Sequence, residues 1–395
     1  MTEQRILKKG IYSIGAIDWD RRLFDALIPL PDGTSYNSYL IKGSSKNLLI
    51  DTVDAAMPEG LLKNLGDLKV EVLDYVVANH AEQDHAGSLP QVLKKYPMAK
   101  VVTNEKCKGL LMDELLIKEE RFLVIKDKEE LSLGDKTIQF FIAPWVHWPE
   151  TMFSYLKEDK ILFPCDYLGS HYATSDLFVK DEKIIYEAAK RYYAEIMMPF
   201  RVNVRKHLEL IKGLAIDLIA PSHGPIYDKP KFILDAYADW SSENVKNEVV
   251  IPYVTAHGST KVMVEYLVNA LTGKGLIVKQ YELTSTDIGK LAMELVDAAT
   301  VIVGTPAMLV GAHPQAAYAA FLVNALRPKV KNIGIIGSFG WGNKVVEQLA
   351  GMISSLKVDV LDPVMIKGYP KKDDLKKLDL LADTVVEKHK VLGLM

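Results

Sequence analysis

The region 248–395 alternates strand-like and helix-like segments in a regular order. Short β-rich runs occur at 248–254, 276–283, 300–305, 332–338 and 358–362, and a helical pattern follows each of them. Successive strand–helix units favour a parallel sheet with helices on both faces, because each crossover returns in the same hand. We therefore predict a doubly wound α/β domain over 248–395.

Residues 1–247 follow a different pattern and are predicted to form a first domain. A helical pattern covers 89–96, and the polar stretch 241–248 marks the boundary with the second domain. Two domains suit a chain of 395 residues, which is long for one core. Neighbouring β-rich runs favour antiparallel or mixed sheets in this domain, and they lie at 12–17, 39–41, 47–53, 73–79 and 137–144.

Charge and composition exclude several classes of protein. The net charge is −3 and the charged residues are interspersed in sign, so the chain has no basic stripe for nucleic acid. No segment has the pattern of a signal peptide or the apolar length of a membrane span. The two cysteines, Cys107 and Cys165, form neither a CxxC motif nor a disulfide framework. We expect a cytoplasmic protein that binds neither nucleic acid nor membranes.

Four residues of metal-ligand type lie within six positions of the stretch NHAEQDHAG, residues 79–87. They are His80, Glu82, Asp84 and His85, and they follow the apolar run LDYVVA. A strand that ends in a turn can direct all four toward one point, whereas helical spacing would send Glu82 away from His80 and Asp84. Such a density of donors is rare by chance and predicts a metal site.

Three more donors each follow an apolar run: His147, Asp166 and His223. Taken alone, either histidine is more often a buried core residue, and Asp166 is more often a turn or helix cap. Because all seven donors occur in one chain at comparable places, we predict that they bind metal together.

The pattern HxExDH, followed by His147, Asp166 and His223, resembles the metallo-β-lactamase fold, whose hydrolytic members carry HxHxDH. Glu82 replaces the second histidine, as in the flavodiiron proteins, also called A-type flavoproteins. The resemblance covers essentially the whole chain and includes GAIDWD, TSYNSYLI, VHWPETMF and APSHG. It implies an N-terminal αββα metallo-β-lactamase-like sandwich and a C-terminal flavodoxin-like parallel sheet.

By this resemblance two iron ions share the seven donors. His80, Glu82 and His147 are expected to bind one iron, and Asp84, His85 and His223 the other, with Asp166 as the bridge. His85 is the least secure ligand, because some members of the family leave this histidine off the metal. A carboxylate-rich set suits iron, since extra negative charge offsets that of two ferric ions.

Several residues near the donors are expected to surround the metals. His171 matches a histidine near the family's iron site and is expected to orient a ligand or to donate to substrate. Tyr192 is a pocket candidate, as are Trp148 and Phe24, although aromatic core packing is the more common role for each. Cys165 should point away from Asp166 if both belong to a strand, and would then be buried filler.

The stretch TAHGST, residues 255–260, resembles the phosphate loop of flavodoxins. It lies between a strand and a helix start, where backbone N–H groups and hydroxyls can surround a phosphate, although a Ser/Thr-capped helix is the simpler alternative. It lacks the lysine of a P-loop, so a monophosphate such as that of FMN fits better than a triphosphate. The candidate residues are Thr255, Ala256, His257, Gly258, Ser259 and Thr260.

Two later glycine-punctuated stretches, 304–309 and 337–342, follow the third and fourth strands of the second domain, at the edge where doubly wound sheets bind ligands. Trp341 or Met308 is placed to pack on the flavin ring. His257 and His313 are either flavin contacts or solvent-exposed loop residues. The additional candidates are Thr305, Pro306, Ala307, Met308, Leu309, Ser338, Phe339, Gly340, Trp341 and Gly342.

The resemblance implies an oxidoreductase in which FMN passes single electrons to a non-haem diiron centre that reduces O2 to water or NO to N2O. Since the chain has no CxxC pair, no rubredoxin domain is expected, and electrons should come from an external rubredoxin-like protein or a reduced deazaflavin coenzyme. The family also implies a head-to-tail homodimer or a dimer of dimers. The residues leave O2 and NO open as substrates.

Two other functions compete with this one. The first is a dinuclear zinc hydrolase with a flavodoxin-like appendage, which Glu82 disfavours. The second is an electron-transfer or sensing protein with a vestigial first domain. A vestigial site should have lost at least one ligand, whereas all seven are present.

Overall fold

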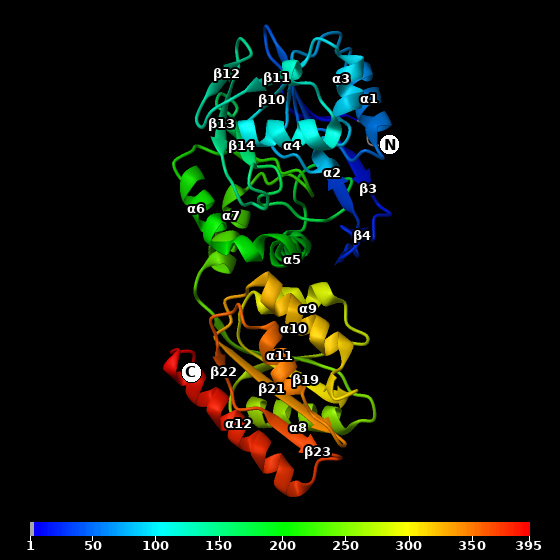
Figure 1. Ribbon diagram of the computed structural model, residues 1–395. Coiled ribbons are helices and arrows are strands. Elements are labelled where there is room, and N and C mark those ends of the chain that lie inside the picture. The colour runs from blue at the N-terminus through cyan, green and yellow to red at the C-terminus, as the bar shows by residue number, and fades with distance from the viewer. Residues whose placement is uncertain (1–3) are drawn as a thin grey trace. The chain divides into compact units, whose positions relative to one another are not determined.

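The structure, a computed structural model, describes residues 4–395 (Figure 1). Its contacts separate two compact units, one of residues up to Tyr193 together with Phe200–Ser241, the other of Ala194–Pro199 and Ser242–Met395. The proposed domain boundary at 247 falls inside a strand that begins at Lys246. Short helical turns lie at Glu119–Arg121, Tyr193–Met197 and Met198–Phe200.

The first unit contains two large sheets, and the first of them is mixed. Strands β1, β2, β7 and β8 pair antiparallel in this order, whereas β8, β9, β10 and β11 run parallel. Mixed sheets were predicted here, and the prediction is confirmed. The strand order is β1 (Arg5–Lys8), β2 (Ile11–Ser13), β7 (Tyr39–Lys42), β8 (Asn47–Ile50), β9 (Tyr75–Val77), β10 (Lys100–Thr103) and β11 (Phe122–Val124).

The second sheet is antiparallel except at its last pair, where β15 and β16 run parallel. Its strands are β12 (Glu130–Ser132), β13 (Thr137–Ile142), β14 (Met152–Leu156), β15 (Ile161–Phe163) and β16 (Leu218–Ile219).

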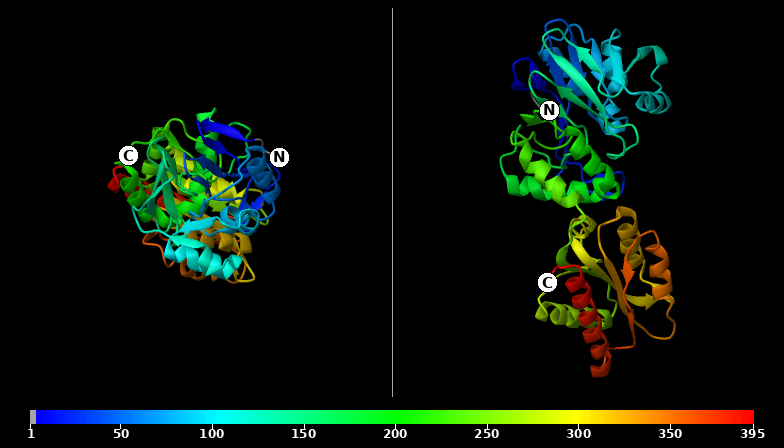
Figure 2. Two further views of the ribbon diagram at one scale, coloured as in Figure 1. Left: turned by 90° about the horizontal axis from the view of Figure 1, so that it is seen from above. Right: turned by 90° about the vertical axis from the view of Figure 1, so that its left-hand side faces the viewer.

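Alternation along the strands explains the layers. Leu49 and Val76 pack with the helices that cover the first sheet, while Leu48 and Val77 pack against the second sheet. Because neighbouring side chains of a strand point to opposite faces, each apolar strand of the first sheet serves two cores. Figure 2 shows the helices on either side of the two sheets. They are α1 (Pro58–Asp67), α3 (Leu89–Lys95) and α4 (Glu105–Leu115) on one side, and α5 (Glu182–Tyr192), α6 (Arg201–Ile211) and α7 (Pro230–Ser241) on the other.

The second unit is the predicted doubly wound domain. Its sheet has the order β18–β17–β19–β21–β22, with parallel pairing throughout this path, which is the flavodoxin order. The strands are β17 (Lys246–Tyr253), β18 (Ile277–Glu282), β19 (Ala298–Met308), β21 (Asn332–Phe339), β22 (Asp359–Val360) and β23 (Val364–Lys367), the last also parallel to β21. Helices α8 (Ser259–Gly273) and α12 (Lys372–Val391) cover one face, and α9 (Ile288–Leu295), α10 (Pro314–Leu326) and α11 (Val345–Met352) the other (Figure 1).

Several predicted strand limits are wrong. The runs 47–53 and 73–79 shorten to β8 and β9, and three other runs change as follows. The run 12–17 is split: β2 ends at Ser13, and β3 (Ala16–Asp18) pairs with β6 (Thr34–Tyr36) in a separate ribbon. The strand expected at 300–305 extends to Met308, because β20 (Gly311–Ala312) folds back and pairs with its end. The run 358–362 gives only the two-residue β22. A further short hairpin joins β4 (Leu23–Phe24) to β5 (Ile28–Pro29).

Within residues 4–395, no helix is long and apolar enough to cross a membrane.

Candidate metal centre and flavin site

The stretch 79–87 leaves the first sheet and forms a short helix rather than only a turn. Strand β9 ends at Val77, His80 lies in the loop that follows, and Glu82 precedes α2 (Gln83–Ala86). Asp84 and His85 therefore project from a helix, whereas His80 and Glu82 project from the chain that leads into it. Because the backbone changes direction here, His80 and Glu82 contribute to one group of donors, and Asp84 and His85 contribute to a second group beside it.

The other three donors follow strands of the second sheet. His147 lies after β13, Asp166 after β15 and His223 after β16. Gly224, directly after His223, has φ +81°, and a Cβ there would lie 2.1 Å from Ser170 Oγ. Only glycine fits this approach, so the loop that carries His223 is tightly defined.

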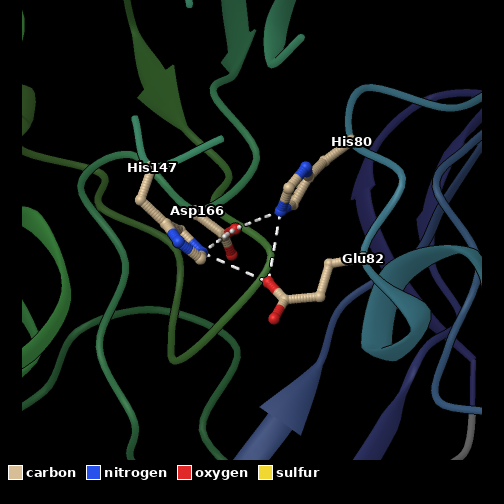
Figure 3. A group of neighbouring side chains, drawn as sticks. All are labelled: His80, Glu82, His147 and Asp166. Carbon is tan, nitrogen blue, oxygen red and sulfur yellow. Dashed lines mark hydrogen bonds and ion pairs between the residues drawn. The ribbon is translucent and has the colours of Figure 1, made fainter. Parts of the chain in front are cut away.

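The first subsite consists of His80, Glu82 and His147. Figure 3 shows these side chains converging together with Asp166. Both histidine Nε2 atoms lie 3.2 Å from Oε2 of Glu82. Two donors bonded to one transition-metal ion at about 2.1 Å are roughly 3.0–3.4 Å apart, so this spacing is that of a ligand set.

The second subsite consists of Asp84, His85 and His223. Nε2 of His223 lies 3.1 Å from Asp84 Oδ2, and Nε2 of His85 lies 3.3 Å from Asp84 Oδ1. All three residues are at most 4% exposed. The spacing again matches donors that share one ion.

Asp166 stands between the two subsites and presents a different oxygen to each. Its Oδ2 lies 3.4 Å from His80 Nε2 and 3.5 Å from His147 Nε2. Its Oδ1 lies 2.8 Å from His85 Nε2 and 3.3 Å from His223 Nε2. A carboxylate arranged in this way is able to bridge two ions.

Burial of the carboxylates shows that the site fits cations. Within the described part of the chain, both oxygens of Asp84 and of Asp166 are buried without a hydrogen bond of acceptable geometry. The histidine nitrogens near them point at shared positions instead. Burying a carboxylate is costly unless positive charge lies beside it, and a metal ion at each shared position would provide that charge.

The same carboxylates shift the pKa values of the histidines. Burial works to lower the pKa of His147, but Asp166 and Glu82 raise it to about 9. Burial also opposes ionisation of His223, whose pKa Asp166 and Asp84 raise to about 10. Burial favours the neutral form of Asp166, but His85, His147 and His223 hold its pKa well below the ordinary value.

His171 and Tyr192 lie beside the second subsite. The His171 ring is 4.6 Å from that of His223 and 4.8 Å from that of Tyr192. Nδ1 of His171 lies 2.8 Å from Thr34 Oγ1, and its buried Nε2 has no partner among residues 4–395. Burial, followed by the charge of His223, lowers the pKa of His171 well below its ordinary value.

The two other aromatic candidates, Phe24 and Trp148, lie near the site. Phe24 contacts His171 at 5.3 Å between rings, and Trp148 meets His80 edge to face at 5.0 Å. Trp148 therefore borders a donor, whereas Phe24 borders His171.

The expectation that Cys165 points away is wrong: β15 ends at Phe163, and Cys165 lies in a turn with φ 54°. Its sulfur is within 4.8 Å of donor atoms of His85 and Asp166, although the side chain is buried as expected.

Sequence reasoning missed two residues that hold the donors. Glu150 lies 2.6 Å from Nδ1 of His80, and the backbone carbonyl of Ser35 accepts a 2.6 Å hydrogen bond from Nδ1 of His223. Glu150 occurs three positions after His147, in a stretch already noticed as family-like. The sequence gives no indication that it turns back toward His80.

The candidate phosphate loop of the second unit lies between β17 and α8. Gly258 has φ 86° and no atom within 4 Å of its would-be Cβ, so the loop is open at this point. Oγ1 of Thr255 accepts from the backbone N–H of Gly258 at 3.1 Å. Ser259 Oγ lies 2.7 Å from Ser338 Oγ, which brings this loop and the end of β21 together.

The candidate stretches 304–309 and 337–342 lie at the same edge of the sheet, because β19 and β21 pair in parallel there. Thr305 pairs with Gly337 and Pro306 with Ser338 in the parallel β19–β21 ladder. Leu309 and Trp341 are each 90% exposed, and Met308 is 47% exposed. The hydroxyl groups and accessible backbone of the loop thus suit a phosphate, and the exposed apolar side chains of the later stretches suit a flat ring. His313 is the N-cap residue of α10, and His257 lies in the loop before α8.

Comparison with known proteins gives consistent matches over this architecture. The family model "ODP family beta lactamase" matches residues 34–224. A nitric oxide reductase of Moorella thermoacetica is 35% identical over 95% of this chain and 96% of its own. A flavo-diiron protein of Clostridium acetobutylicum is 32% identical over 94% of this chain and 96% of its own.

Among solved structures, rubredoxin:oxygen oxidoreductase of Desulfovibrio gigas superposes with a TM-score of 0.94 at 30% identity, covering 98% of this chain and 99% of that one.

The chain belongs to the flavodiiron protein family. Membership makes it an oxidoreductase whose cofactors are a non-haem diiron centre and FMN. For this chain we propose the donors described above as the iron ligands and the loops of 255–260, 305–309 and 338–342 as the FMN site.

Asp166→Ala should release iron and leave FMN bound. The change removes the carboxylate that offers one oxygen to each ion, whereas the flavin loops belong to the other unit. Metal analysis and flavin absorbance per chain measure both effects. Asp217→Ala, at a half-exposed carboxylate of the same unit, is the control and should keep its iron. Full iron content in Asp166→Ala would show that this residue is no bridge.

Iron uptake should release protons. At neutral pH, the metal-free protein carries protons on His147 and His223, whose pKa values are about 9 and 10, but iron binds the neutral ring. Affinity should therefore rise with pH up to these values. The protonated histidines stabilise the metal-free fold fully below their ordinary pKa, and this stabilisation disappears as pH rises through 9 to 10.

Calorimetric titration of apoprotein with ferrous iron, in buffers of different ionisation enthalpy, counts the protons released. Uptake at pH 7 without proton release would contradict the assigned protonation.

Proposed function

We propose that this protein reduces O2 to water or NO to N2O in the cytoplasm. Both substrates occur in the names of its relatives, which include the nitric oxide reductase of Moorella thermoacetica and a rubredoxin-oxygen oxidoreductase of Megalodesulfovibrio gigas, 31% identical over 95% of this chain. Two iron ions held by these donors would supply one-electron chemistry to such a small substrate. The protein's part is to hold the ions, to exclude bulk water and to offer hydrogen-bond donors.

The bridging geometry of Asp166 carries this proposal. One carboxylate that presents separate oxygens to two donor sets fixes two ions close enough to act on one small molecule. His171 lies beside this centre with a buried Nε2 that no described residue contacts. We assign His171 and Tyr192 to hydrogen bonding with the substrate or its products.

Glu82 separates this function from hydrolysis. Its Oε2 lies 3.2 Å from both histidines of the first subsite, so a carboxylate occupies the position of a third neutral ligand. The added negative charge favours iron in changing oxidation states over zinc. A zinc hydrolase with a flavodoxin-like appendage therefore fits the site less well.

Electrons come from an external donor in this proposal. The relatives point to two chemical classes: a rubredoxin in Megalodesulfovibrio gigas, and reduced coenzyme F420 in Methanothermobacter marburgensis, whose coenzyme F420H2 oxidase is 30% identical over 93% of this chain. FMN held by the loops of the second unit would supply the exchange between a two-electron donor and one-electron iron chemistry.

Anaerobic stopped-flow tests the function. The purified protein should contain about two irons and one FMN per chain, and the reduced form should be reoxidised rapidly by O2, by NO or by both. Zinc-loaded protein is the control, since it retains FMN but has no redox-active metal. Zinc as the only metal after expression with iron available, or no faster reoxidation than in the zinc form, would refute the proposal.

We further propose a head-to-tail homodimer or a dimer of such dimers, in which the FMN of one subunit serves the iron of its partner. Each first domain would meet the partner's second domain about a two-fold axis. The proposal rests on the family resemblance.

Complementation tests the assembly. Asp166→Ala and a double variant Gly258→Ala/Thr260→Ala should each be inactive alone, the first through its metals and the second through its flavin loop. If transfer runs between subunits, each heterodimer keeps one intact pair of cofactors, and activity should return as subunits exchange. Heterodimers that mass spectrometry confirms but that stay inactive would exclude transfer between subunits.

A further inference from the structure

Glu150 is a fully buried carboxylate that the proposed ligand set does not include. Its side chain is 0% exposed, and its Oε1 lies 2.6 Å from Nδ1 of His80. The same oxygen accepts the backbone N–H of Ala81 at 3.0 Å, and Asn104 Nδ2 donates to the backbone carbonyl of Glu150 at 2.6 Å. The side chain is thus held against the outer nitrogen of a metal ligand.

This contact defines which nitrogen of His80 faces the metal. An ionised carboxylate only accepts hydrogen bonds, so Nδ1 of His80 carries the proton and Nε2 presents its lone pair to the first subsite. A carboxylate behind the ring also raises the basicity of the ligating nitrogen. Within residues 4–395, the second oxygen of Glu150 has no hydrogen-bond partner, so its negative charge is only partly offset.

Within residues 4–395, neither histidine of the second subsite has a carboxylate hydrogen-bonded to its Nδ1. Nδ1 of His223 donates to a neutral acceptor, the backbone carbonyl of Ser35, at 2.6 Å. Nδ1 of His85 is buried without a hydrogen-bond partner among the residues that the structure describes. Three of the four histidine ligands therefore differ at Nδ1: His80 faces a carboxylate, His223 faces a backbone carbonyl, and His85 has no hydrogen-bond partner among residues 4–395.

We propose that Glu150 is a positioning residue that makes the two iron sites unequal, so that the iron at His80, Glu82 and His147 is bound more tightly and has the lower reduction potential. The proposal rests on metal binding by these residues and is independent of which gas is reduced. A more basic ligand and an extra negative charge both favour the ferric ion. The iron at Asp84, His85 and His223 is then the first to be reduced and the first to be lost to a chelator.

Two variants separate the hydrogen bond from the charge. In Glu150→Gln the amide oxygen is still able to accept from His80, so both irons should remain, while the loss of charge should raise the reduction potential of the first iron. In Glu150→Ala both contributions disappear, and iron affinity at the first subsite should fall by about 10–100-fold. The order of iron loss to a chelator should then be reversed.

Mössbauer spectra of the ⁵⁷Fe-loaded protein during redox titration and chelation follow each iron separately. Glu114→Gln is the matched control: Glu114 is an exposed acid that interacts through space with the charges of both Glu150 and His80. It should leave both irons as in the wild type, and the wild type itself must show two irons and gas reduction for the comparison to be valid.

A purely structural role for Glu150 predicts a different result. In that case Glu150→Ala loses both irons equally together with thermal stability, and Glu150→Gln has the potentials of the wild type. Either of these findings would overturn the proposal. Should Glu150→Ala fail to fold, the potential of the first iron in Glu150→Gln decides alone.

Discussion

Burial of negative charge at Asp166 is the constraint on which the first unit depends. Asp166, Asp84 and Glu150 are at most 4% exposed, and carboxylates so placed need positive charge nearby. Two metal ions provide it in the loaded protein. In their absence the histidines provide it, because the carboxylates raise the pKa values of His147 and His223 to about 9 and 10. The fold and the metal centre are therefore thermodynamically linked.

Hydrogen bonds from neighbouring strands, some of them across the two sheets, hold the loops that carry the donors. In the first sheet, Tyr39 donates through its hydroxyl to the carbonyl of Pro221 at 2.8 Å, just before His223. Asn37 donates to the carbonyls of Pro221 and Gly224, on both sides of that histidine. Thr52 holds the carbonyl of His85 through its hydroxyl at 2.6 Å. Donors on different strands thus keep fixed separations, as a two-metal site requires.

What the sequence could predict follows from how local each signal is. The strand–helix order of the second unit and the seven donors each depend on short sequence patterns. The doubly wound fold and the candidate ligands could therefore be predicted from the sequence. Glu150 was not, because its role depends on a loop that turns back to His80, 70 positions away. The direction of Cys165 was predicted wrongly, since the strand ends two residues earlier than the apolar run suggests. Tertiary contacts decided both cases.

The two candidate sites solve opposite physical problems. The metal centre holds charge in a closed interior, where low dielectric strengthens every contact and makes each unsupported group costly. The flavin edge exposes large apolar side chains, with Leu309 and Trp341 each 90% accessible, beside hydroxyls and an open glycine turn. An exposed edge suits a cofactor that must meet an external donor, whereas a closed centre suits chemistry on a small gas. Housing them in separate units allows each site to keep the burial that its chemistry needs.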